Sequence, residues 1–196
     1  MTLSTISTSS LEEVASATPT SPKFFQLYIY KDRSITEKLV QRAEKSGFRA
    51  IVLTVDTPTF GTRYADEHNG FALPSHLKMA NFDSQLKESN RLNISKGGGS
   101  SLAEYSNSLF DPDLRWTDIA WLKSITKLPI ICKGVLTGED AKLAVQAGCS
   151  AILVSNHGGR QLDTVPSTVS LLLFFLFSLF CFSFFLLLFR FVFFYV

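Results

Sequence analysis

The chain has 196 residues, a net charge of +2 and a hydrophobic fraction of 46%. This length suits one ordinary domain, and the charge indicates neither a nucleic-acid partner nor an acidic one. Its cysteines, Cys132, Cys149 and Cys181, are unevenly spaced, so the sequence predicts neither a disulfide framework nor a metal site. We expect a reducing compartment, with Cys132 and Cys149 as small core residues. Residues 1–10 lack the pattern of a secretory signal.

The first elements follow the order strand, helix, strand. Residues 25–30 predict a strand, and the spacing of Ser34 and Glu37 matches a capping box that opens a helix. We expect that helix to end at Gly47 in a left-handed cap. Residues 50–55 form an apolar run that is too short and too β-branched for a helix, which predicts a strand buried on both faces.

A second group of elements follows a long connection. Its pattern predicts a helix over 116–126, a strand over 129–135, a helix over 137–147 that ends at Gly148, and a strand over 151–155. Because strands and helices alternate, the sequence predicts an α/β fold with a parallel sheet.

The connection between the two groups, residues 56–115, is far longer than an ordinary loop between a strand and a helix. Residues 57–63 leave directly from a strand end, which favours a role in a site. For residues 84–100, a functional lid and an insertion without function both stay open. His68 and His76 also lie in this connection, and we expect both to be ordinary surface residues.

Polar side chains stand where each expected strand ends. They are Gln26 and Tyr28, then Thr54 and Asp56 with Arg63 beyond, then Lys133, then Ser155, His157 and Arg160. The carboxyl ends of parallel strands meet at one edge of a sheet, where ligands bind in α/β proteins. Each residue alone could be a cap or an ordinary core residue, but chance does not place a functional group at every strand end. The set suits an anionic substrate from which a proton is removed.

Four motifs occur in a fixed order along the chain. They are FQLYIYKDR at Phe25–Arg33, LTVDTP at Leu53–Pro58 with Gly61 and Arg63 beyond, LPIICKGV at Leu128–Val135, and SNHGGRQLD at Ser155–Asp163. Over residues 3–168 the chain thereby resembles the FMN-dependent 2-hydroxy acid oxidase family, the group of glycolate oxidase and long-chain hydroxy acid oxidase. The resemblance implies a partial TIM (β/α)8 barrel over residues 1–168, from the end of strand two through strand six, with FMN across the carboxyl-terminal mouth.

The resemblance also implies which residues hold the cofactor. Gln26, Thr54 and Ser155 are expected to hydrogen-bond the flavin. Lys133 is expected beside the N1 and C2 carbonyl of the flavin, where a cation stabilises the anionic reduced ring.

For catalysis, the resemblance implies that Arg63 and Arg160 bind the substrate carboxylate, a task suited to planar forked donors. Tyr28 is expected to hydrogen-bond the substrate hydroxyl. His157 is expected to take a proton, with Asp56 stabilising the resulting imidazolium. The implied reaction oxidises a small (S)-2-hydroxy acid such as glycolate or L-lactate to the 2-oxo acid, and oxygen becomes hydrogen peroxide.

The rest of the chain, residues 169–196, is a low-complexity segment rich in Phe and Leu, with Arg190 as its only charge. Its stretch 171–189 is long enough for a membrane anchor, and a translated intron is the other interpretation. Relatives of this type commonly form homo-oligomers and are peroxisomal. The final residues Phe194–Val196 are not a peroxisomal tripeptide, so cytosolic and membrane-associated locations stay open.

Relative to the family, we expect the chain to lack the first strand, most of the second strand, and strands seven and eight. In TIM barrels the last two strands carry the loops that bind phosphate. Weak FMN binding and poor turnover are therefore expected of this chain. An inactive truncated product and a tail-anchored membrane protein are the alternatives to an active oxidase.

Overall fold

The computed structural model describes residues 1–82 and 101–171. They form one five-stranded sheet in which neighbouring strands follow each other in chain order and every pair is parallel. The strands are β1 (Thr2–Leu3), β2 (Phe24–Leu27), β3 (Ala50–Thr54), β4 (Ile130–Val135) and β5 (Ala151–Val154). The predicted parallel α/β fold is confirmed.

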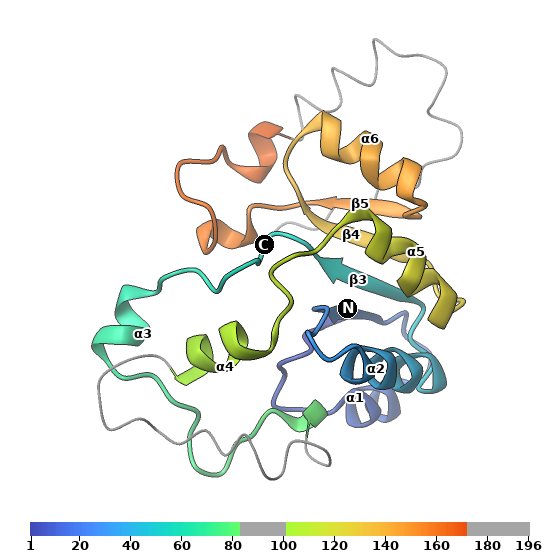
Figure 1. The fold of residues 1–196 in the computed structure, drawn as a ribbon. Helices are drawn as coiled ribbons and strands as arrows, with labels where there is room; N and C mark the ends of the chain where they lie inside the picture. The colour runs from blue at the N-terminus through green and yellow to red at the C-terminus, as the bar shows by residue number, and fades with distance from the viewer. Residues whose placement is uncertain (83–100, 172–196) are drawn as a thin grey trace.

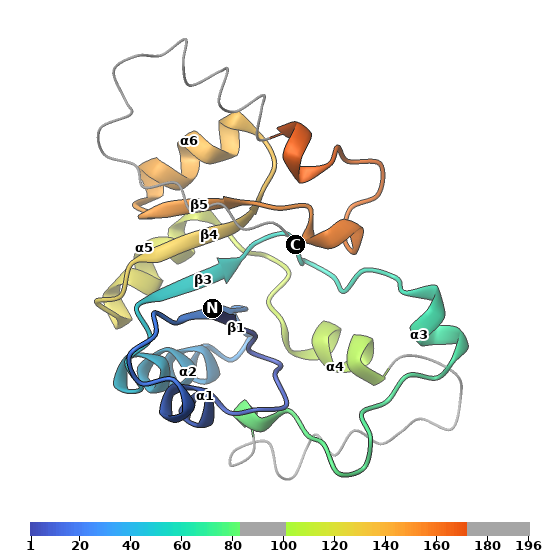
Figure 2. The ribbon, with the colours of Figure 1, turned by 180° about the vertical axis from the view of Figure 1, so that it is seen from behind.

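Helices pack along one side of this sheet. They are α1 (Leu11–Ala17), α2 (Arg33–Lys45), α5 (Trp116–Ile125) and α6 (Gly138–Ala147). Figures 1 and 2 show them on the outer side of the curved sheet, with α3 (Tyr64–His68) and α4 (Ser101–Leu109) away from it, beyond the carboxyl ends of the strands. Two short 3-10 helices cover Ala80–Phe82 and His157–Gly159.

Alternation along the strands separates the two faces of the sheet. Side chains such as Ile51 and Leu53 of β3 belong to the large core shared with the helices. Their neighbours Ala50 and Val52 belong to a second, smaller cluster with Ile131, Ala151 and Leu153. All five residues of β3 are buried, which confirms the predicted strand buried on both faces. The second face is the one that leads to the polar residues at the strand ends.

The helix α2 differs from its prediction at its start. Its N-cap is Asp32, whose carboxylate accepts a hydrogen bond of 3.0 Å from the backbone N–H of Ser34. The predicted capping box at Ser34–Glu37 is therefore wrong, because the helix already begins at Arg33. The predicted end is confirmed, since Gly47 follows the last turn with φ at +78°.

The strand predicted over 25–30 is shorter in the structure. It leaves the sheet after Leu27, and Tyr30 instead forms an antiparallel bridge with Phe110. The backbone of Ile29 accepts a hydrogen bond of 3.0 Å from the N–H of Asp111. Residues 28–30 are thus extended, but they pair with the segment after α4 instead of with a strand of the sheet.

The other predicted elements agree closely with the structure. The helix over 137–147 begins after Thr137, which caps it, and ends at Gly148 with φ at +93°. Cys132 and Cys149 are buried free thiols, as predicted for core residues. His68 and His76 are exposed.

Several predictions concern residues that the structure does not describe. These are the candidate lid over 84–100, Cys181, and the segment from residue 172 to residue 196. The proposed membrane segment 171–189 lies outside the described residues apart from Leu171, and the domain division at residue 168 stays a prediction. Within residues 1–82 and 101–171, no helix has the length and apolar character needed to cross a bilayer.

Candidate active site

The polar residues predicted at the strand ends continue the second face of the sheet. Along β3, Thr54 and Asp56 follow Ala50 and Val52 at alternate positions, so they belong to the same face. Thr54 is paired in register with Lys133 on β4. By the same alternation, Gln26 follows Phe24 on β2, and Ser155 follows Leu153 on β5. The structure therefore brings residues from four strands to one rim.

Three charged or titratable side chains meet at the centre of this rim. His157 Nδ1 lies 2.9 Å from Asp56 Oδ1, and Lys133 Nζ lies 3.3 Å from the same ring nitrogen. Lys133 Nζ is also 3.8 Å from Asp56 Oδ2. The three side chains are 11–19% exposed, so water screens their interactions only weakly. Burial lowers the pKa of Lys133, and Asp56 opposes that shift by favouring the charged ammonium.

The 2.9 Å contact with the carboxylate of Asp56 favours the tautomer of His157 that carries its hydrogen on Nδ1, although Lys133 Nζ also lies 3.3 Å from that nitrogen. A carboxylate oxygen only accepts hydrogen bonds, so Nδ1 of the ring donates to it. In the neutral ring this leaves the lone pair on Nε2. The pair therefore has the arrangement of a general base that is oriented by an acidic residue.

The turn that carries His157 is conformationally costly. His157 has φ at +61°, a region that non-glycine residues seldom occupy. Its backbone N–H donates to Ser155 Oγ at 3.0 Å, and the amide oxygen of Asn156 accepts from the N–H groups of Gly158 and Gly159. These local hydrogen bonds hold the turn in place and aim the imidazole at Asp56.

Gly134 gives Asp56 the room to lie beside β4. It has φ at +106°, and a Cβ atom at this position would lie 2.6 Å from both Cβ and Cγ of Asp56. The pairing of β4 with β5 shifts register between Lys133 and Val135, on either side of this glycine. A glycine is thus required here by both backbone and space.

Tyr28 lies just beyond β2, with its ring stacked on Phe110 at a centroid distance of 4.2 Å. Only 8% of the residue is exposed. Burial, assisted by the negative charge of Asp56, raises the pKa of Tyr28 to about 12. The phenol is therefore a neutral O–H donor at neutral pH.

The structure also brings the two predicted arginines into electrostatic contact. The guanidinium of Arg63 lies over the ring of Phe60 at 3.8 Å, and its Nε is buried without a hydrogen-bond partner among the described residues. Burial and the positive charge of Arg160 both lower the pKa of Arg63. Arg160 is exposed. Two guanidinium groups whose charges repel each other favour the binding of an anion near both.

Gln26, Thr54 and Ser155 form the buried polar part of the rim. Gln26 Nε2 donates to Thr54 Oγ1 at 3.0 Å, and Gln26 Oε1 accepts from the backbone N–H of Thr5 at 3.1 Å. None of the three is more than 9% exposed. A hydroxyl that accepts a hydrogen bond still carries its own O–H, so Thr54 and Ser155 can each donate one.

The sequence did not single out several residues that shape the site. Gln161 and Asn156 hold loops through side-chain amides, Gly134 gives Asp56 its space, and Phe60 packs under Arg63. All but Phe60 lie within motifs that were recognised as whole segments. These residues shape the site because segments far apart in the chain pack against each other. A single sequence carries no signal for such packing.

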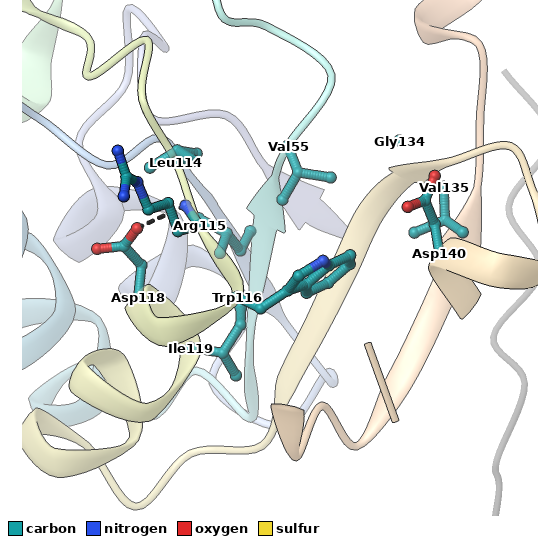
Figure 3. Close-up of a pocket in the computed structure, with 10 residues that line it drawn as sticks. Val55, Leu114, Arg115, Trp116, Asp118, Ile119, Gly134, Val135 and Asp140 are labelled. Atoms are coloured by element: carbon teal, nitrogen blue, oxygen red, sulfur yellow. Dashed lines mark hydrogen bonds between the residues drawn. The ribbon is translucent and has the colours of Figure 1, made fainter. Parts of the chain in front are cut away.

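A cavity of about 250 Å³ lies on the other face of the sheet, between the N-terminal ends of α5 and α6 (Figure 3). Its lining includes Trp116 and Asp140 from these helices. Leu53 and Val55 of the lining alternate with Thr54 and Asp56, so the cavity is on the helix side and separate from the polar rim.

Comparison with known proteins places this arrangement in a family. The profile of the FMN-dependent dehydrogenases matches residues 1–174. Glycolate oxidase 1 of Oryza sativa subsp. indica is 54% identical over 173 residues, which cover 88% of this chain and 45% of that protein.

Solved structures agree with this result. Mandelate oxidase with (S)-4-hydroxymandelic acid aligns with a TM-score of 0.79 at 40% identity, covering 91% of this chain and 48% of that one. A putative lactate oxidase of Pediococcus acidilactici aligns with a TM-score of 0.79 at 35% identity, covering 98% and 47%. The chain thus spans about half the length of these proteins, and its sheet corresponds to part of a TIM barrel, as predicted. The chain belongs to the FMN-dependent dehydrogenase family.

Proposed function

We propose that this protein oxidises a small (S)-2-hydroxy acid, such as glycolate or L-lactate, to the 2-oxo acid, with FMN as cofactor and oxygen converted to hydrogen peroxide. The observation that carries the proposal is the 2.9 Å contact between His157 and Asp56, on the rim that also holds Lys133. Arg63 and Arg160 add a positive site for a carboxylate. The names of the relatives, glycolate oxidase among them, support the same chemistry.

The rim residues fit FMN by the kinds of group they offer. Gln26, Thr54 and Ser155 provide buried amide and hydroxyl groups, which suit the hydrogen-bonding edge of a flavin ring. Lys133 provides a cation on the same rim, paired in register with Thr54. Bound FMN supplies the acceptor for the two electrons that leave the substrate. The ammonium of Lys133 would stabilise negative charge on a flavin held at this rim.

Two arginines and a tyrosine bind and orient the substrate. Arg63 and Arg160 donate to the carboxylate, which relieves the repulsion between their guanidinium groups. Tyr28 donates its phenolic hydrogen to the substrate hydroxyl oxygen. A pKa of about 12 keeps that hydrogen in place across the physiological range. These contacts fix the positions of the substrate carboxylate and hydroxyl oxygen relative to His157.

The proton of the substrate is taken by His157 at Nε2, because Nδ1 already donates to Asp56. The imidazolium then interacts with the carboxylate across 2.9 Å. Asp56 faces Lys133 with its other oxygen, Oδ2, at 3.8 Å. One carboxylate thus offsets two positive charges, which makes the protonated histidine less costly beside the lysine.

The test uses the full chain loaded with FMN. Without oxygen, addition of L-lactate or glycolate should bleach the absorbance of oxidised flavin, and with oxygen it should produce hydrogen peroxide. D-lactate is the control for stereochemistry, and His157→Gln is the control for the base. The proposal is wrong if FMN does not bind at millimolar concentration or if His157→Gln bleaches as fast as the wild type.

The remaining predictions follow from the family and concern the intact protein. A homo-oligomer and a peroxisomal location both stay predictions, as does membrane association through residues 171–189. Sedimentation of the purified chain tests the first, and fractionation of cells that express it tests the other two.

A further inference from the structure

We propose that Gln161 is a positioning residue: its side-chain amide clamps the loop of residues 56–61 to the loop of residues 156–161, and so holds Arg63 and Arg160 together as one carboxylate site. The inference rests on the proposed function for the identity of the anion. The clamp itself rests on contacts of the chain alone.

The amide of Gln161 bridges the two loops through three hydrogen bonds. Its Nε2 donates to the backbone oxygen of Asp56 at 3.0 Å and to that of Thr59 at 2.9 Å. Its Oε1 accepts from the backbone N–H of Gly61 at 3.1 Å. A primary amide has two N–H groups, so both are accounted for. One side chain therefore fixes three points of the loop that joins Asp56 to Arg63.

The backbones of the two loops also touch directly beside the clamp. A Cβ atom at Gly61 would lie 2.0 Å from the carbonyl oxygen of Arg160, closer than any real contact allows. Gly61 does not have a positive φ, so the space and not the backbone conformation requires a glycine. The loop that leads to Arg63 is thus pressed against the residue that carries the second guanidinium.

The two arginines beside the clamp carry like charges, and Asp66, 3.9 Å from the guanidinium of Arg63, offsets part of that charge. Arg160 lowers the pKa of Arg63 through its charge, and the Nε of Arg63 is buried without a partner among the described residues. Before an anion binds, this repulsion favours separation of the loops. The hydrogen bonds of Gln161 oppose that separation, so the site is already formed when the carboxylate arrives.

The first experiment measures amide hydrogen exchange in the full chain without FMN. In Gln161→Met the exchange of the Gly61 amide should be at least about tenfold faster than in the wild type, since its acceptor is gone. Gln146→Met replaces an exposed glutamine of α6 and should leave that rate unchanged. An unchanged rate in Gln161→Met would overturn the clamp.

The second experiment measures steady-state oxidation of L-lactate with FMN bound. Gln161→Met should raise KM about tenfold or more and lower kcat less, because the carboxylate site is disturbed more than His157. Gln161→Glu keeps the acceptor for Gly61 but turns a carboxylate oxygen toward the carbonyls of Asp56 and Thr59. It should therefore preserve the slow exchange of Gly61 and still raise KM.

These two readouts separate the clamp from the proposed function. If the wild type oxidises no 2-hydroxy acid, the proposed function fails, while the exchange of Gly61 still decides whether the clamp exists. If Gln161→Met fails to fold, Gln161→Glu carries the test. A wild-type KM in Gln161→Glu would show that the donated hydrogen bonds do not position the arginines.

Discussion

The buried phenol of Tyr28 links the stability of the fold to alkaline pH. Its pKa is about 12 in the folded chain and about 10 when exposed, so the unfolded chain loses this proton first as pH rises. The raised pKa therefore contributes stability that is complete below pH 10 and is lost as pH rises toward 12. Two pKa units correspond to about 2–3 kcal/mol of unfolding free energy.

Denaturant unfolding at pH 9 and at pH 12 checks this link in wild type and Tyr28→Phe. We expect the wild type to lose about 2–3 kcal/mol more over this interval than the variant. All other titratable groups are present in both proteins, so the difference between the two losses reports Tyr28. Tyr64 is 81% exposed, so Tyr64→Phe is the matched control and should follow the wild type. Equal losses in wild type and Tyr28→Phe would contradict the raised pKa.

A second prediction at the scale of the residue concerns Gly134. The added methyl group of Gly134→Ala meets Asp56 at 2.6 Å, and the backbone at φ +106° is unfavourable for alanine. We expect a loss of about 1–3 kcal/mol in unfolding free energy and at least a tenfold loss in kcat, because Asp56 must move away from His157.

The control for Gly134 is Gly138, at the start of α6. An added Cβ there meets nothing within 4 Å, and its φ is not positive. Gly138→Ala should therefore leave kcat unchanged and stabilise the fold by up to about 1 kcal/mol. Equal effects of the two substitutions on kcat would show that the position of Asp56 does not depend on Gly134.

At the scale of the element, the cap of α2 can be tested by substitution. Asp32→Ala removes the side-chain acceptor for the N–H of Ser34 and should cost about 0.5–2 kcal/mol in unfolding free energy. Ser34→Ala should cost less, because the alanine backbone still donates the capping hydrogen bond. Thermal or denaturant unfolding measures both. The reverse order of costs would restore the capping box at Ser34–Glu37.

The errors at the element boundaries have physical causes. The pattern of residues 25–30 is apolar and aromatic throughout, yet only partners in space decide where a strand stops, and Tyr30 meets Phe110 across 80 positions of the chain. β1 contains only Thr2 and Leu3, too few residues for any periodicity to be visible. By contrast, β3 is a continuous buried run and α6 has a capping residue at each end. Both are local signals, and the sequence predicts both elements closely.

At the scale of the whole molecule, the alternation of strands and helices predicted that all strand ends share one edge. That rule is sufficient to bring Thr54, Lys133 and Ser155 to one rim, since parallel strands must end together. It does not predict which loops touch. The clamp of Gln161 depends on a loop-to-loop contact between residues about 100 positions apart, and no local pattern encodes that distance.

The last prediction treats FMN as a ligand that stabilises the whole fold. A ligand that binds only the folded chain raises the unfolding free energy by about 2.7 kcal/mol at 100 times its dissociation constant, and the rise can be followed as a shift in Tm. Lys133→Met removes the partly buried cation of the rim and should reduce this shift at equal FMN concentration. Lys127→Met replaces an exposed lysine outside the rim and should keep it. A full shift in Lys133→Met would mean that the ammonium of Lys133 does not contact FMN, because the loss of a cation that contacts the flavin should weaken its binding.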